Sequence, residues 1–134
     1  MTGSAVTLTG STYSLLGGTL AATGCVRVTV FAHHSTGTTA STLNVYVGTA
    51  TYSEVVPITT SEAEEIIEYC NNGSTGAGSQ SFTRENSYNA TGAVTPAWQT
   101  FTQASTGALS IYVQATATSG DYWQLDKMRV DLIQ

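Results

Sequence analysis

Short runs in which β-branched and polar residues alternate are the feature that most constrains this fold. The run Cys25–His34 places its valines on one face and Arg27, Thr29 and His33 on the other. Such a period of two predicts a half-buried strand. The same pattern predicts strands at residues 42–47 and 108–115, whose aliphatic residues point inward.

Weaker strand signals fill most of the remaining chain, each bounded by Gly, Ser, Thr, Asn or Pro. They lie at residues 5–9, 13–16, 52–58, 80–83 and 97–103. A last run, residues 121–133, changes phase between Leu125 and Met128, which predicts a β-bulge near Asp126 and Lys127. Residues 71–79 and 86–96 are expected to be long connections.

One segment, residues 61–70, is predicted to be a helix. Ser61 and Glu64 match a capping box, and Ala63, Ile66, Ile67 and Cys70 follow a period of 3.6. About eight short strands with one short helix indicate an all-β fold, a two-sheet antiparallel jelly-roll sandwich that forms a single domain over residues 1–134. An immunoglobulin-like sandwich is the second choice, because Trp98 and the cysteines lack the order of that fold.

Composition excludes several classes of function. Lys and Arg number 4 against 9 Asp and Glu, with a net charge of -5, so we expect no nucleic-acid partner. No apolar stretch approaches the roughly 20 residues that a membrane helix needs, so we expect no membrane partner. The residues after Met1 lack a basic and apolar leader, so we expect no cleaved secretory signal. The surface is instead rich in hydroxyls, with 24 Thr and 14 Ser.

Residues that could carry chemistry do not form a motif. Cys25 and Cys70 fit no zinc or redox spacing and permit at most one disulfide, and we expect two unreactive, partly buried thiols. His33 and His34 are adjacent on a strand, so they point to opposite faces and are expected to be surface or edge histidines. We therefore predict no enzyme activity, no catalytic residues, no metal site and no cofactor.

The acidic residues permit two interpretations. A solvated helix face is favoured over a calcium site for four glutamates, namely Glu62, Glu64, Glu65 and Glu68. For Asp121 and Asp126, calcium binding with loop carbonyls stays open.

Aromatic residues are the candidates for a ligand site. Exposed aromatic rings on a β-sandwich can stack against sugars, and the candidates are Tyr46, Trp98, Tyr112 and Tyr122. The alternative is that the tryptophans lie in a core or an interface and that the tyrosines stabilise cross-strand pairs. Tyr46 and Tyr112 are the stronger candidates, because their inward neighbours fix them in the outward phase.

Two segments resemble small jelly-roll virion proteins of tailed bacteriophages. They are Gly17-Gly-Thr-Leu with the following strand up to Ala32, and residues 41–49; residues 106–132 look like the closing hairpin of that family. The resemblance implies a non-enzymatic capsid decoration or cement protein, or a head or tail fibre component, in the virion after assembly in the host cytoplasm. Its expected partners are the major capsid protein or other virion subunits, and its expected oligomer is a homotrimer.

The C-terminal half also resembles carbohydrate-binding modules of the galactose-binding-like jelly-roll type. Trp98-Gln-Thr-Phe-Thr and Tyr122-Trp-Gln-Leu-Asp-Lys-Met-Arg-Val carry this likeness. It implies glycan recognition by surface aromatics as the alternative function. Both families share the fold, so the fold does not separate them.

Overall fold

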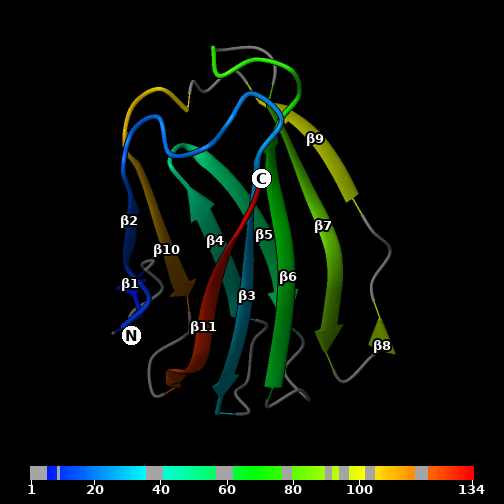
Figure 1. Cartoon of the computed structure of the whole chain (residues 1–134). Coiled ribbons are helices and arrows are strands. Elements are labelled where there is room, and N and C mark those ends of the chain that lie inside the picture. Colours follow the sequence, from blue (N-terminus) through cyan, green and yellow to red (C-terminus); the bar gives the residue numbers. More distant parts are fainter. Residues whose placement is uncertain are drawn as a thin grey trace.

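The structure is a computed structural model of the whole chain, drawn in Figure 1. It describes residues 6–8, 10–35, 41–56, 62–76, 80–89, 92–93, 97–101, 105–116 and 121–134. Within these ranges it does not describe the side chains of Val6, Glu54, Val56 and residues 82–101.

The described residues form eleven strands in two antiparallel sheets. In the five-stranded sheet the order is β1-β10-β4-β5, with β2 also paired to β10. Its strands are β1 (Val6–Thr7), β2 (Tyr13–Leu15), β4 (Ser41–Val47), β5 (Ala50–Val56) and β10 (Leu109–Thr116). In the six-stranded sheet the order is β11-β3-β6-β7-β8, with β9 also paired to β7. Its strands are β3 (Cys25–His34), β6 (Glu62–Asn71), β7 (Gln80–Asn89), β8 (Gly92–Ala93), β9 (Ala97–Phe101) and β11 (Trp123–Ile133).

The two sheets face each other across one hydrophobic core. Alternation within each strand supplies it: Val26, Val28 and Val30 of β3 and Val45 of β4 are all 0% exposed. Figure 1 shows the six-stranded sheet in front, with β11 at the edge nearest to β1 and β2. The all-β, two-sheet sandwich expected from the sequence is therefore confirmed. No helix in the described part of the chain is long and apolar enough to cross a bilayer.

Several finer predictions are also confirmed. The three strongly alternating runs are β3, β4 and β10. The register between β11 and β3 shifts between Leu125 and Lys127, which is the bulge that the phase change predicts. One weaker prediction needs correction, because β7 runs on to Asn89 and so takes up residues that were expected to form a connection over 86–96.

The predicted helix at residues 61–70 is wrong, because this segment is strand β6. β6 lies between β3 and β7 and pairs with both, so its backbone hydrogen bonds are satisfied by two neighbours. Every second residue of β6 faces the core, including Ala63, Ile67 and Tyr69. The segment therefore has a period of two as well as the helical spacing. Ser61, the expected helix cap, lies outside the described residues.

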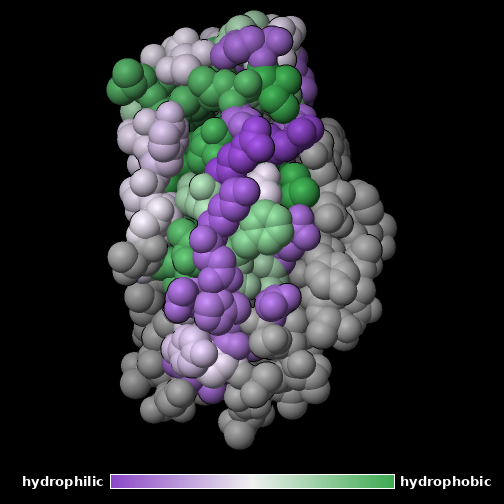
Figure 2. All heavy atoms as spheres, turned by 60° about the horizontal axis from the view of Figure 1, so that its bottom comes forward, coloured by the Kyte–Doolittle hydropathy of each residue, from purple (hydrophilic) through white to green (hydrophobic). Residues whose placement is uncertain are grey.

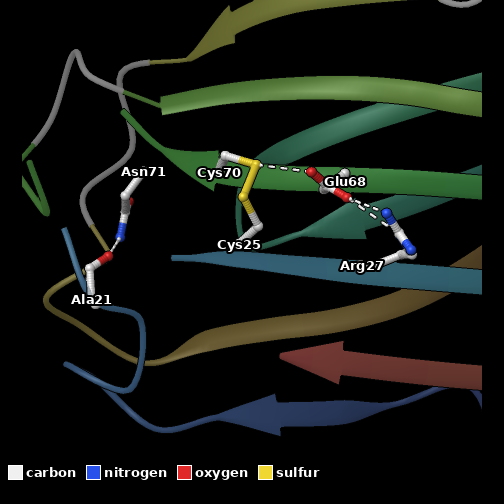
Figure 3. Close-up of a disulfide and its surroundings, with 6 residues drawn as sticks. All are labelled: Ala21, Cys25, Arg27, Glu68, Cys70 and Asn71. Carbon is white, nitrogen blue, oxygen red and sulfur yellow. Dashed lines mark hydrogen bonds and ion pairs between the residues drawn. A yellow bond between two sulfur atoms is a disulfide. The ribbon is translucent and has the colours of Figure 1, made fainter. Parts of the chain in front are cut away.

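The cysteines are joined, which corrects the expectation of two thiols. β3 and β6 place Cys25 directly opposite Cys70, with their Cα atoms 4.1 Å apart and an S–S bond of 2.10 Å. Figure 3 shows this disulfide beside the ion pair of Arg27 and Glu68, whose Nη2 and Oε2 atoms are 2.9 Å apart. The bond links the first residue of β3 to the end of β6 on the outer face of the sheet.

Candidate functional site

The outer face of the five-stranded sheet carries the two strongest candidate residues. Along β4, the inward residues Leu43, Val45 and Val47 are fully buried, so the residues between them point outward. The same alternation along β10 leaves Tyr112 on the outer side. The outward phase predicted for Tyr46 and Tyr112 is therefore confirmed.

Tyr46 and Tyr112 form one stacked pair. The register of β10 against β4 places them directly opposite each other. Their ring centroids are 4.5 Å apart and the ring planes differ by 7°. Each ring is half-buried, and stacking covers one face of each ring. Because β10 and β4 are the middle strands, the stack lies at the centre of this face.

A row of polar side chains runs beside the stack. Two residues further along each strand, Gln114 lies opposite Asn44, and their outer neighbours across the sheet are Thr7 and Ser53. The Gln114 amide donates from Nε2 to Thr7 Oγ1 over 3.2 Å. Two residues along a strand span about 7 Å, so this amide and hydroxyl row lies one sugar-ring width from the aromatic row.

Charge is distributed unequally between the two outer faces. Among the outward side chains that the structure describes on the five-stranded sheet, none is charged. Arg27, Lys127 and Arg129 all lie on the outer face of the six-stranded sheet, where Arg129 pairs with Asp131 at 2.8 Å and Lys127 Nζ lies 6.0 Å from the Phe31 ring centroid. The face that carries the tyrosine stack therefore has hydroxyls and amides as its polar groups.

The other aromatic candidates do not join this site. Tyr122 precedes β11 and is 55% exposed, and its ring centroid lies 6.1 Å from that of His33 in an edge-on contact. Trp98 lies on β9 at the side of β7, in the other sheet, and its side chain is outside the description. Trp123 is buried and stacks on His34 with centroids 4.5 Å apart. The four candidate residues therefore do not form one binding site.

The two histidines point to opposite faces, as expected, but only one lies at the surface. His33 Nδ1 is 2.8 Å from Asp126 Oδ1 on the outer face. His34 is 3% exposed, points toward the core, and its Nδ1 donates to the Ser35 carbonyl over 2.6 Å. The expectation of two surface or edge histidines is thus wrong for His34, because even-numbered residues of β3 face inward and β3 lies between β11 and β6. The two rings share no site.

The glutamates of β6 do not form one solvated helix face. Glu65 is 0% exposed and faces the core, which alternation in a strand demands and a helix does not. Glu62 and Glu64 line a groove of about 430 Å³ with Phe31 and Asp126.

Metal ligands are not assembled in the part of the chain that the structure describes. The one group of three possible ligands there is Cys25, Glu68 and Cys70. Both sulfurs are consumed by the disulfide, so this group offers no thiolate. Cys70 Sγ lies 3.3 Å from Glu68 Oε1, but a disulfide sulfur carries no hydrogen, so this contact is not a hydrogen bond. Asp121 and Asp126 belong to separate contacts, with Ser35 and His33 respectively.

Comparison with known proteins gives no relative. No family model matches the chain, and no curated protein and no solved structure is significantly similar to it.

Proposed function

We propose that this chain is a non-catalytic carbohydrate-binding domain and that the outer face of its five-stranded sheet binds the sugar. The observation that supports this is the parallel stack of Tyr46 on Tyr112 at the centre of a face without described charges. A sugar ring presents an apolar C–H face and a rim of hydroxyls. An aromatic ring takes up the first, and amides and hydroxyls take up the second.

The geometry supplies both kinds of contact side by side. The exposed part of each tyrosine ring accepts the C–H face of a sugar, and the amides of Asn44 and Gln114 lie one row away. Thr51, opposite Tyr46, adds a hydroxyl on the other flank. Both middle strands pair with a strand on either side, so the backbone that carries the contact groups is already ordered before binding.

The ligand expected from this chemistry is a neutral glycan. Sulfated or uronic-acid sugars are normally held by Arg or Lys, and the described basic residues lie on the opposite sheet. Binding to a neutral glycan forms no ion pair. Its affinity should therefore change little between low and physiological salt.

The test is titration of the protein with a panel of neutral glycans at millimolar concentration, followed by calorimetry or NMR. We expect Tyr112→Ala and Tyr46→Ala each to weaken binding at least tenfold. Tyr13→Ala is the matched control, because Tyr13 is 47% exposed but lies on the edge strand β2 opposite the inward-facing Ile111, on the other face of the sheet from the stack. No binding to any member of the panel, or an equal loss in the Tyr13 variant, would contradict the proposal.

Cross-strand stabilisation by the stack is a separate effect and is measured separately. A double-mutant cycle on the free energy of unfolding with Tyr46→Ala and Tyr112→Ala should give a coupling of about 0.5–1.5 kcal/mol. Tyr46→Phe keeps the stack and removes one hydroxyl. If that variant binds sugar like the wild type, the ring face carries the affinity.

The virion role implied by the bacteriophage resemblance is the second candidate. The observation that favours it is the exposed apolar edge of β11, where Leu132 and Ile133 are 44% and 39% exposed, since such surfaces serve contacts between subunits. A decoration protein would stabilise a shell by binding only the assembled state. The two roles are compatible, because a glycan-binding domain on a virion would serve adsorption to the host. Binding of the purified protein to capsids that lack it would test this role, and no binding at micromolar concentration would contradict it.

A further inference from the structure

Strand β11 forms one edge of the six-stranded sheet. It pairs with β3, and no residue in the described ranges pairs with its other side. An edge strand leaves its outward N–H and C=O groups available to another strand. The bulge near Asp126 interrupts β11, and the regular part of the strand is residues 127–133.

The core-facing side of this segment is apolar and only partly covered. Met128, Val130 and Leu132 lie opposite the fully buried Val30, Val28 and Val26 of β3, so they face the interior. We call Leu125, Met128, Val130 and Leu132 the apolar strip. Leu125, Met128 and Val130 pack against the core as partly buried residues, and Leu132 is 44% exposed.

Hydrophobic side chains also gather at the surface of the molecule, as Figure 2 shows. Hydrophobic side chains lie in a row beside the diagonal band of hydrophilic side chains that runs over β11. The strip continues toward Leu8 near β1, which lines a hollow of about 380 Å³ with Leu125 and residues 122–124. Apolar surface therefore lies next to an open strand edge.

The outward side of the same segment carries charges of both signs. Arg129 and Asp131 alternate with the apolar residues, and within one chain Arg129 Nε lies 2.8 Å from Asp131 Oδ2. Charges that only protect an edge need not be arranged so that two antiparallel copies of the strand place opposite charges against each other. Here they are arranged in this way. Val130 is the midpoint of residues 127–133, and Arg129 and Asp131 flank it symmetrically with opposite charges.

We propose that two copies of this chain pair through β11, antiparallel and about a two-fold axis at Val130, so that the six-stranded sheets become continuous. In this register Val130 faces Val130 of the second copy and Met128 faces Leu132, which extends the apolar strip across the interface. Arg129 faces Asp131 twice, which gives a cluster of two positive and two negative charges. All seven residues after the bulge take part in the pairing.

Neighbouring registers are less favourable. An axis at Arg129 places two arginines opposite each other, and an axis at Asp131 places two aspartates opposite each other, each of which is destabilising. An axis at Met128 sets Lys127 against Arg129 and runs into the bulge. The register at Val130 is the one that combines opposite charges with the longest pairing. Because the interface is one strand wide, we expect dissociation in the micromolar range.

The first test is the mass of the purified protein across concentration by analytical ultracentrifugation. A dimer that dissociates on dilution is expected. A monomer at hundreds of micromolar would overturn the proposal. So would a stable trimer, the state that the virion-protein resemblance implies, because a two-fold strand pairing closes at two copies.

The second test fixes the register by cross-linking. Val130→Cys faces itself across the axis and should give a covalent dimer under mild oxidation on a non-reducing gel. Met128→Cys is the matched control: it lies on the same side of the same strand and faces Leu132, so two such cysteines lie about 13 Å apart along the strands. Equal cross-linking of the two variants, or cross-linking of neither, would overturn the register.

A charge swap distinguishes loss of pairing from loss of folding, because association is expected to return when two non-associating variants are mixed. Arg129→Asp alone and Asp131→Arg alone should each be monomeric, because like charges then face each other. A mixture of the two variants should form a heterodimer, since every facing pair is again opposite in sign. Failure of the mixture to associate, while both variants unfold at the wild-type temperature, would overturn the proposal.

Discussion

Loss of the disulfide between Cys25 and Cys70 should lower stability by an amount that follows from the loop it closes. The two residues are separated by 45 positions in sequence. In the chain-entropy treatment, a loop of about 46 residues costs about 13.5 cal/mol/K in the unfolded state, or about 4 kcal/mol at 25 °C. Cys25→Ser with Cys70→Ser removes this constraint from the unfolded chain and leaves the β3–β6 pairing in place.

The effect on thermal stability is correspondingly large. Unfolding entropy is about 2.1 cal/mol/K per residue near 60 °C, which gives about 280 cal/mol/K for the 134 residues. A loss of about 4 kcal/mol therefore lowers the melting temperature by about 14 °C. Calorimetry of the wild type with and without reductant, and of the double serine variant, measures this shift. The serine variant should be indifferent to reductant.

Two results would refute this account. Titration of two free thiols in the native protein under oxidising conditions would show that the bond does not form. A loss below about 1 kcal/mol in urea unfolding, with the bond proven by mass spectrometry, would show that the unfolded chain is already confined without it.

Two paired substitutions test the fold itself. Ile67→Ala should cost about 2–5 kcal/mol in the free energy of unfolding, because Ile67 is 0% exposed, whereas Ile66→Ala on the outer face should cost far less; similar losses would contradict the strand β6. Gly17→Ala should cost about 1–3 kcal/mol, because an added Cβ would lie 2.5 Å from the Thr106 carbonyl oxygen. Gly107→Ala has no atom within 4 Å of the new Cβ and should be tolerated, and equal melting temperatures of the two glycine variants would contradict the close approach at Gly17.

The local pattern predicts those parts of the fold in which one signal dominates. The sequences of β3, β4 and β10 fit a period of two and no other, so they predict strands. The bulge in β11 follows from a change of phase that a regular strand cannot contain. In residues 61–70, by contrast, a period of two and a period of 3.6 share Ala63 and Ile67. Acidic residues and a capping box then favour the helix locally, and the pairing with β3 and β7 outweighs them.

One missed strand accounts for the other missed features. With residues 61–70 in a helix, Cys70 has no reason to lie near Cys25, and Glu65 has no reason to face the core. The register of β6 against β3 imposes both. Likewise the outward phase of Tyr46 and Tyr112 follows from each strand alone. Their stacking depends on the register between β4 and β10, which no local signal contains.

The most direct test of the proposed function is the map of backbone amide shifts when a neutral glycan is added to the wild-type protein. We predict that the shifts concentrate on β4, β5 and β10 around Tyr46 and Tyr112 and reach Asn44 and Gln114, and that they vanish in the Tyr112→Ala variant. Shifts that concentrate instead around Tyr122 and the start of β11, or no shifts with any neutral glycan at millimolar concentration, would contradict the assignment of this face.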